Sequence, residues 1–187
     1  VGMLAVGVVF SALFYSLITR LVTNSEIDWA DFGRNFLRTS LQLAMLFVVI
    51  ILVLFLFSIP LSIMAAFSSL INPGVGVIIL LMASILLMWA VIFFSFSLPT
   101  LFFQHGSPAR AVLNSARFLQ KHIATALPML MLLFLIRSLT NSLWLSADDG
   151  SWLTLVSIAG HAFVATALTA SLFIFYRDRA VLTVAPQ

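Results

Sequence analysis

Two ionisable residues, His161 and Arg137, lie inside long apolar stretches of this chain. A side chain that can carry charge is expensive in such surroundings, so both are the first candidates for chemistry. A histidine at this position can relay protons or act as an axial ligand to a haem or pigment, and an arginine can line an ion pathway. The alternative for both is structural, as a histidine hydrogen bonded between helices and an arginine that reaches toward the membrane surface.

Spacing along a helix gives each residue an expected depth. Arg137 lies fifteen residues beyond His122, or about 22 Å along an ideal helix, which places it toward the outer boundary of its span. A structural role is favoured there, either by extension of the side chain to the interface or by pairing with Asp148 or Asp149 across the short turn that follows.

His161 lies nine residues after Trp152, about 14 Å along the helix and near the middle of the membrane. Ser157, Ala165 and Thr169 share its helical face, so we expect it to point into a seam of small residues between packed helices. No second intramembrane histidine accompanies it, because His105 and His122 fall at the borders of the apolar stretches.

Signatures of an enzyme are missing from the rest of the sequence. The six acidic residues lie in loops or beside the apolar stretches, so no carboxylate pair forms inside the membrane. A glycine-rich phosphate loop and a His-Glu-x-x-His metal helix are both absent, and without cysteine there is no disulfide or thiolate metal site. We expect a protein that is not an enzyme and that has no catalytic residue, metal site or cofactor.

The elements that position these residues follow from a long stretch without charge. Between Arg38 and Arg110 the sequence contains no Asp, Glu, Lys or Arg, and the whole chain is 63% hydrophobic and 8% charged. Ordinary globular domains contain about 25% charged residues. Backbone within lipid must be helical or part of a closed barrel, and continuous apolar runs favour helices. The fold class expected is an all-α polytopic bundle of transmembrane helices.

Hydropathy predicts about five spans within one integral membrane domain that covers residues 1–187. A reversal between the second and third spans is expected at Ile71-Asn72-Pro73-Gly74, because proline lacks a donor and glycine permits positive φ. The chain does not open on Met, so further residues are expected upstream, which leaves room for a sixth helix there. The five predicted spans are Gly2–Val22, Thr39–Met64, Val75–Phe103, Ile123–Leu145 and Trp152–Tyr176.

Basic residues give the orientation, because short cytoplasmic loops retain Lys and Arg. Of the nine Lys and Arg residues, all but Arg137 fall on one side of the five-span arrangement. That side is predicted to be cytoplasmic, with the C-terminus on it, and the upstream helix would place both ends there. Trp144 and Trp152 flank the loop on the opposite side, as interfacial aromatic residues do.

Two connections on the basic side have the pattern of amphipathic interfacial helices. The first begins near Ser25 and Asp28, a capping pattern, and carries Trp29 on its apolar face. The second begins at Ser107-Pro108, after which basic residues line one face and apolar residues the other. Contact with anionic lipid headgroups and simple solvation both account for the basic face. The candidate headgroup residues are Trp29, Arg110, Arg117 and Lys121.

Each of these segments leads into a two-span hairpin, which suggests a parallel duplication or a chance likeness between hairpins. The second half also carries short motifs: Pro-Thr-Leu-Phe-Phe at 99–103, Ser-Pro-Ala-Arg-Ala at 107–111, Asn-Ser at 114–115, Phe-Leu at 118–119 and Tyr-Arg-Asp at 176–178. In these the chain resembles a bacterial multi-spanning inner-membrane family related to the membrane domain that accompanies some glycerophosphoryl diester phosphodiesterases. The resemblance implies six spans and a cytoplasmic amphipathic helix. No segment resembles the phosphodiesterase catalytic domain.

Small-residue seams and few buried charges favour a non-enzymatic accessory, scaffold or membrane-organising subunit of a bacterial inner membrane. The alternative is a small oligomeric transporter or channel with Arg137 and His161 near its pathway. Expected partners are membrane lipids, including anionic ones, and either other membrane subunits or further copies of the chain. Nucleic acid is not expected, because the basic residues are few and lie beside the membrane spans rather than on one broad face.

Overall fold

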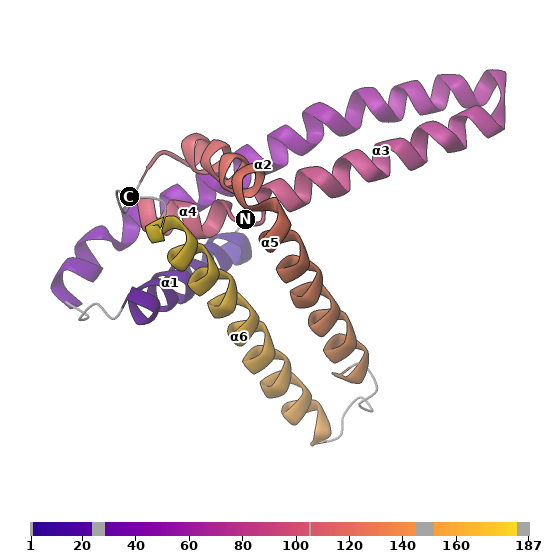
Figure 1. Cartoon of the computed structure of the whole chain (residues 1–187). Coiled ribbons are helices and arrows are strands. Elements are labelled where there is room, and N and C mark those ends of the chain that lie inside the picture. The colour runs from indigo at the N-terminus through magenta and orange to yellow at the C-terminus, as the bar shows by residue number, and fades with distance from the viewer. Residues whose placement is uncertain (1, 24–28, 105, 145–151, 183–187) are drawn as a thin grey trace.

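The computed structural model describes residues 2–23, 29–104, 106–144 and 152–182. These residues form six α-helices and no strand (Figure 1). The fold is therefore all-α, as predicted. The helices are α1 Gly2–Thr23, α2 Trp29–Ile71, α3 Pro73–Phe94, α4 Ser97–Gln104, α5 Pro108–Trp144 and α6 Leu153–Leu182.

Five stretches of helix within the described residues are long and apolar enough to cross a membrane. They fall where the sequence predicted the five spans, so the polytopic architecture is confirmed and the chain is an integral membrane protein. At 43 residues, α2 is about 65 Å long, roughly twice the thickness of a bilayer core. Part of α2 must therefore tilt strongly or extend beyond the hydrocarbon.

The helices form two arms that diverge from a common junction (Figure 1). One arm is the antiparallel hairpin of α2 and α3, and the other is the hairpin of α5 and α6. Helices α1 and α4 lie at the junction, against α2, α5 and α6. The junction thus holds the bases of both arms, and the tips of the arms lie far apart.

The tip of the first arm reverses where the sequence predicted, although Gly74 belongs to α3 and does not adopt the positive φ considered for it. Asn72 has an extended backbone, with φ −149°, and its side-chain oxygen accepts a hydrogen bond of 2.9 Å from the amide of Gly74. Pro73 is the first residue of α3, where its missing N–H leaves no hydrogen bond unmade. Helix α2 therefore ends at Ile71 and α3 begins at Pro73, with Asn72 alone between them.

The predicted third span is interrupted. Helix α3 ends at Phe94, and α4 begins at Ser97. Pro99 explains the break, because a proline cannot donate to the carbonyl four residues earlier and its ring clashes with that group, which here belongs to Ser95. The Ser95 amide instead bonds to the Ile92 carbonyl at 3.2 Å, a tighter turn than the α-helix. The interruption carries Phe96 and α4 into the junction.

The two predicted amphipathic helices are joined to the spans that follow them. Trp29 begins α2, which continues through the whole second span. Ser25 and Asp28, the capping residues expected there, lie outside the described residues. The basic segment from Pro108 is the first part of α5, and non-helical backbone at His122 (φ −118°, ψ 23°) divides it from the fourth span. The predicted boundary between His122 and Ile123 therefore coincides with a kink.

All six helices contribute to the core at the junction. Two buried clusters form there, and the partly buried Ile92 and Phe93 bring α3 against the second of them. The first cluster consists of Ala12, Ile18, Val22, Leu43, Leu46, Leu101, Phe102, Ala111 and Phe173. The second consists of Phe96, Leu119, Ala126 and Tyr176.

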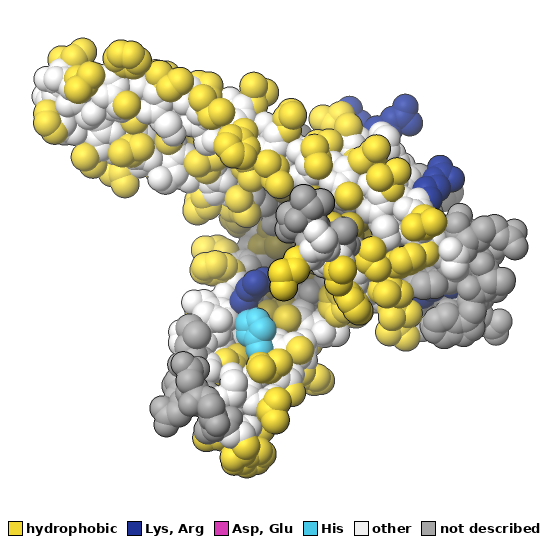
Figure 2. Space-filling view, turned by 180° about the vertical axis from the view of Figure 1, so that it is seen from behind, with side chains coloured by type: hydrophobic (Ala, Val, Ile, Leu, Met, Phe, Trp, Pro, Cys, Tyr) yellow, Lys and Arg dark blue, Asp and Glu magenta, His cyan; other side chains and the backbone are white. Residues whose placement is uncertain are grey.

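The arms, by contrast, expose many large apolar side chains, and Figure 2 shows them on one face of both arms. Phe67 and Leu81 on the first arm are 67% and 60% exposed, and Phe134 and Phe163 on the second are 74% and 76% exposed. Such surfaces are stable only against lipid or against other apolar helices. The chain buries the side chains of its junction and leaves the apolar side chains of its arms exposed.

Small residues bring α2 and α3 together along the first arm. Ala65 and Ala83 are buried, at 3% and 7% exposure, and Gly76 is buried beside Ser69. A Cβ atom placed on Gly76 would lie 2.6 Å from the Cβ and 3.0 Å from the Cα of Ser69. The two backbones therefore approach as closely as a glycine allows, in the manner of other membrane helix pairs.

Replacement of Gly76 by alanine is expected to force the tip of the first arm apart. Gly76→Ala should lower the free energy of unfolding by about 1 to 3 kcal/mol, because the backbone of α2 must move. Gly7→Ala in α1 is the matched control, since nothing lies within 4 Å of a Cβ there and the gain in helix propensity is the same. Thermal unfolding in detergent measures both. Equal shifts for the two variants would contradict close packing at Gly76.

Candidate functional site at the helix junction

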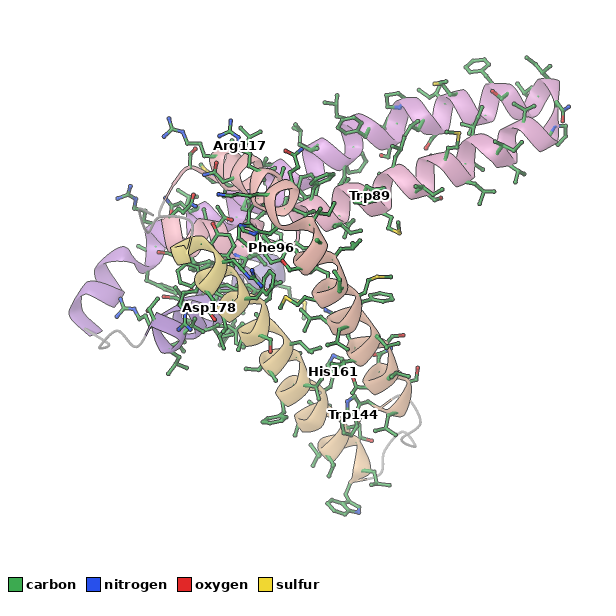
Figure 3. The ribbon with its side chains drawn as sticks, in the orientation of Figure 1. Trp89, Phe96, Arg117, Trp144, His161 and Asp178 are labelled. Atoms are coloured by element: carbon green, nitrogen blue, oxygen red, sulfur yellow. The ribbon has the colours of Figure 1, made fainter. Side chains whose placement is uncertain are left out.

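Tyr176, near the end of α6, is the largest of the fully buried side chains in the described part of the chain, with 2% of its surface exposed. Its ring lies against three phenylalanine rings that come from the α3–α4 connection, α4 and α5. The ring centroids are 6.4 Å from Phe96, 5.8 Å from Phe103 and 4.7 Å from Phe118. Figure 3 shows Phe96 at the point where these helices meet. Tyr176 thus links the bases of the helices through aromatic packing.

A chain of hydrogen bonds begins at the hydroxyl of Tyr176. The Gln104 side-chain amide donates to this hydroxyl at 3.0 Å, and the Asn114 amide donates to the Gln104 side-chain oxygen at 2.7 Å. The three residues belong to α6, α4 and α5. A tyrosine enclosed in an aromatic cluster needs a partner for its hydroxyl, and Gln104 supplies one.

Two further polar contacts connect helices at the junction. Ser115 in α5 donates to the Phe93 carbonyl at 2.6 Å, near the end of α3. Arg177 in α6 donates to the carbonyl of Val22 in α1, and its guanidinium pairs with Asp178 at 2.7 Å. Because Phe93 and Val22 lie near helix ends, these contacts satisfy carbonyls that have no partner within their own helix.

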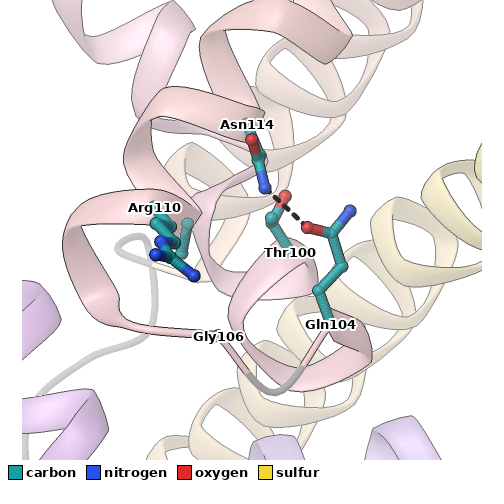
Figure 4. Close-up of a pocket in the computed structure, with 6 residues that line it drawn as sticks. Thr100, Gln104, Gly106, Arg110 and Asn114 are labelled. Atoms are coloured by element: carbon teal, nitrogen blue, oxygen red, sulfur yellow. Dashed lines mark hydrogen bonds between the residues drawn. The ribbon is translucent and has the colours of Figure 1, made fainter.

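A pocket of 180 Å³ opens beside this hydrogen-bonded chain, between α4 and the start of α5 (Figure 4). Thr100 and Ala111 are buried in its wall, and the other lining side chains are partly or fully exposed. The lining residues are Thr100, Gln104, Gly106, Arg110, Ala111 and Asn114. The pocket is therefore polar, with one cationic side chain and two amides.

Of the predicted headgroup residues, the structure brings one into the pocket. Arg110 lines it, and Figure 4 shows its guanidinium beside Gly106. Arg117 and Lys121 are exposed on the same helix but do not line the pocket. The side chain of Trp29 lies outside the described part of the chain.

The expectation that His161 points into the small-residue seam is wrong for the single chain. His161 is exposed, and the adjacent Gly160 takes the place against the ring of Trp144 on α5. Ser157 also faces α5, where its hydroxyl donates to the Trp144 carbonyl at 3.0 Å. Successive residues differ by about 100° around a helix, so the face at Gly160 leaves His161 at the edge of the seam. Figure 3 shows His161 on this arm.

Arg137 is exposed on α5. Its expected partners, Asp148 and Asp149, lie outside the described residues, as does His105. The structure therefore does not test the predicted pairing across the turn. No group of three metal-ligating side chains occurs within residues 2–23, 29–104, 106–144 and 152–182.

Sequence reasoning missed Gln104, Thr100 and the role of Tyr176 in the junction. Gln104 could have been recognised from its position, because it is the first Asn or Gln after Asn72 and follows a long apolar stretch. The short sequence motifs at 98–119 and 176–178 belong to the segments that meet here. Comparison adds no family, because no family model, curated protein or solved structure matches the chain.

The hydrogen bond between Gln104 and Tyr176 is expected to stabilise the junction. Gln104→Leu should lower the free energy of unfolding by about 1 kcal/mol, because the Tyr176 hydroxyl loses its donor. Gln120→Leu, at an exposed position on α5, serves as the control and should change stability by less than about 0.5 kcal/mol.

A double-mutant cycle with Tyr176→Phe isolates the interaction. In the Phe background, Gln104→Leu should have a smaller effect, measured by denaturant or thermal unfolding in detergent. Additive effects of the two substitutions would show that the amide and the hydroxyl do not act on each other.

Proposed function

We propose that this protein is a non-enzymatic accessory or scaffolding subunit that gathers other membrane components against its two arms. The observation that carries the proposal is the contrast between a junction that the chain packs for itself and arms that it leaves exposed. In a membrane, helices associate through shape, small residues and hydrogen bonds rather than through the hydrophobic effect. Exposed arms of this kind offer long surfaces for such association.

The polarity of the first arm supports the proposal. From Thr39 to Gln104 the sequence contains no Asp, Glu, Lys, Arg or His. The hydroxyls of Ser69 and Ser84 donate to carbonyls of their own helices, at 2.7 Å and 2.8 Å. These hydroxyls therefore donate within their own helices, and the arm offers no ionisable side chain to a hydrated path of the kind that a transporter needs.

The proposed location is a bacterial inner membrane, with the junction and the C-terminus on the cytoplasmic side. The last turns of α1 and α6 and the first part of α5 lie away from the tips of both arms (Figure 1). These segments carry Arg20, Arg179 and Arg117. Retention of basic residues in the cytoplasm then orients both arms outward. Membrane lipids, and partner subunits or further copies of the chain, would surround them.

A small oligomeric transporter is the second candidate. Figure 2 shows a histidine and a basic side chain near each other on one face of the α5–α6 arm. His161 and Arg137 belong to this arm and are exposed in the single chain. Copies of the chain that met on this face would enclose both side chains between them.

The orientation can be tested with single cysteines, because the sequence has none of its own. Ile71→Cys, at a position 90% exposed at the tip of the first arm, should react with a membrane-impermeant maleimide added to intact cells that lack an outer membrane. Gln120→Cys, on the basic segment, should react only after the membrane is opened. Labelling of Gln120→Cys in intact cells would contradict the proposed orientation and indicate the opposite one.

The scaffold proposal predicts a partner in stoichiometric amount. Native mass spectrometry on protein extracted gently from its own membrane should detect a complex that contains a different protein at a fixed ratio. Dissociation in harsher detergent should then release the chain intact, since its junction does not depend on the partner.

A complex of identical chains alone would contradict the accessory role and favour the transporter. Flux measurements on His161→Ala and Arg137→Ala would follow in that case, with Arg117→Ala, on the basic segment of α5 before the kink at His122, as the control.

A further inference from the structure

We infer that the pocket between α4 and α5 binds a phosphate group that carries net negative charge. The pocket holds 180 Å³ and is lined by Arg110, by the amides of Gln104 and Asn114, and by Thr100. Arginine is the side chain best suited to phosphate, because its planar guanidinium donates several hydrogen bonds in a fixed geometry. This site goes beyond the proposed scaffold role, which does not require it.

Several hydrogen-bond donors belong to the residues that line the pocket. Asn114 uses one amide hydrogen on Gln104, and Gln104 uses one on Tyr176, so each amide retains a second hydrogen. The Thr100 hydroxyl donates to the Phe96 carbonyl at 2.7 Å. The remaining amide hydrogens and the guanidinium of Arg110 suit a ligand that accepts hydrogen bonds through several oxygens.

The charge around the pocket is positive and lacks a carboxylate among the described side chains. Asp178 is the one acidic residue whose side chain is described, and it is paired with Arg177. Arg110 has no ion pair within this part of the chain. A cation at a membrane surface is attracted to anionic headgroups, by about 1 kcal/mol per residue.

The start of α5 adds to this field. Pro108 is the first residue of the helix and has no N–H, and the Ala111 amide bonds to the Ser107 carbonyl at 3.0 Å. The amides of Ala109 and Arg110 are among the first-turn donors that have no partner within the helix. The positive end of the helix dipole therefore lies beside Arg110, and both favour an anion.

A bound phosphate would also stabilise the junction, because the residues that contact it hold the helices together. Gln104 and Asn114 join α4 to α5, and Gln104 continues the chain to Tyr176 in α6. The same phosphate chemistry has two sources on the cytoplasmic side, an anionic lipid headgroup and a free phosphate ester. Either would order the amides and stabilise the protein against unfolding.

The test compares two arginines of one helix. Arg110→Gln removes the cation from the pocket, and Arg117→Gln removes an exposed cation that does not line it, with the same change in net charge. The full chain in defined mixed micelles is titrated with phosphatidylglycerol, with phosphatidylcholine as the zwitterionic reference. Native mass spectrometry measures the affinity for the first bound lipid. A second titration uses inorganic phosphate and records the midpoint of thermal unfolding.

Arg110→Gln should weaken the binding of phosphatidylglycerol about tenfold, and Arg117→Gln by less than about twofold. Asn114→Asp gives a second variant, because a carboxylate still accepts from the Gln104 amide after that amide rotates, while its charge repels an anion. It too should weaken binding. If Arg110→Gln loses affinity for phosphatidylglycerol and keeps its stabilisation by inorganic phosphate, the ligand is a lipid headgroup. If it loses only the stabilisation by inorganic phosphate, the ligand is a free phosphate ester. Equal behaviour of the two arginine variants with both probes would overturn the site.

Discussion

The packing of Tyr176 against Phe96, Phe103 and Phe118 holds the helices together at one place, and the arrangement of both arms depends on it. In lipid the hydrophobic effect does not draw helices together, because the surrounding chains are as apolar as the side chains. Cohesion must come from close packing and from hydrogen bonds. Both are concentrated at the junction, where Gln104 satisfies the hydroxyl that the aromatic cluster encloses.

This concentration explains why the molecule has a firm base and exposed arms. The first arm is held along its length by small residues such as Ala65, Gly76 and Ala83, and the second by contacts such as that between Gly160 and Trp144. These contacts join the two helices of each hairpin and leave its outer surface uncovered. The polar pocket belongs to the base instead, so the molecule separates a region suited to anions from regions suited to apolar partners.

The sequence predicted the features that depend on local chemistry. The absence of charge between Arg38 and Arg110 located the spans, Asn72 and Pro73 located the first hairpin turn, and His122 marked the boundary at the kink of α5. The divergence of the arms and the junction network were not predictable in this way. They depend on contacts such as Gln104 with Tyr176, 72 residues apart, for which periodicity carries no information.

The measurement that tests the central claim most directly is photo-crosslinking from the arms in the native membrane. A photoreactive residue replaces, one at a time, Leu56, Phe67 and Leu81, which are at least 60% exposed, with the buried Ala83 as the reference. Outward association predicts crosslinks to another protein from the exposed positions and none from Ala83. Crosslinks to lipid alone at all three exposed positions would contradict a scaffold that acts through its arms.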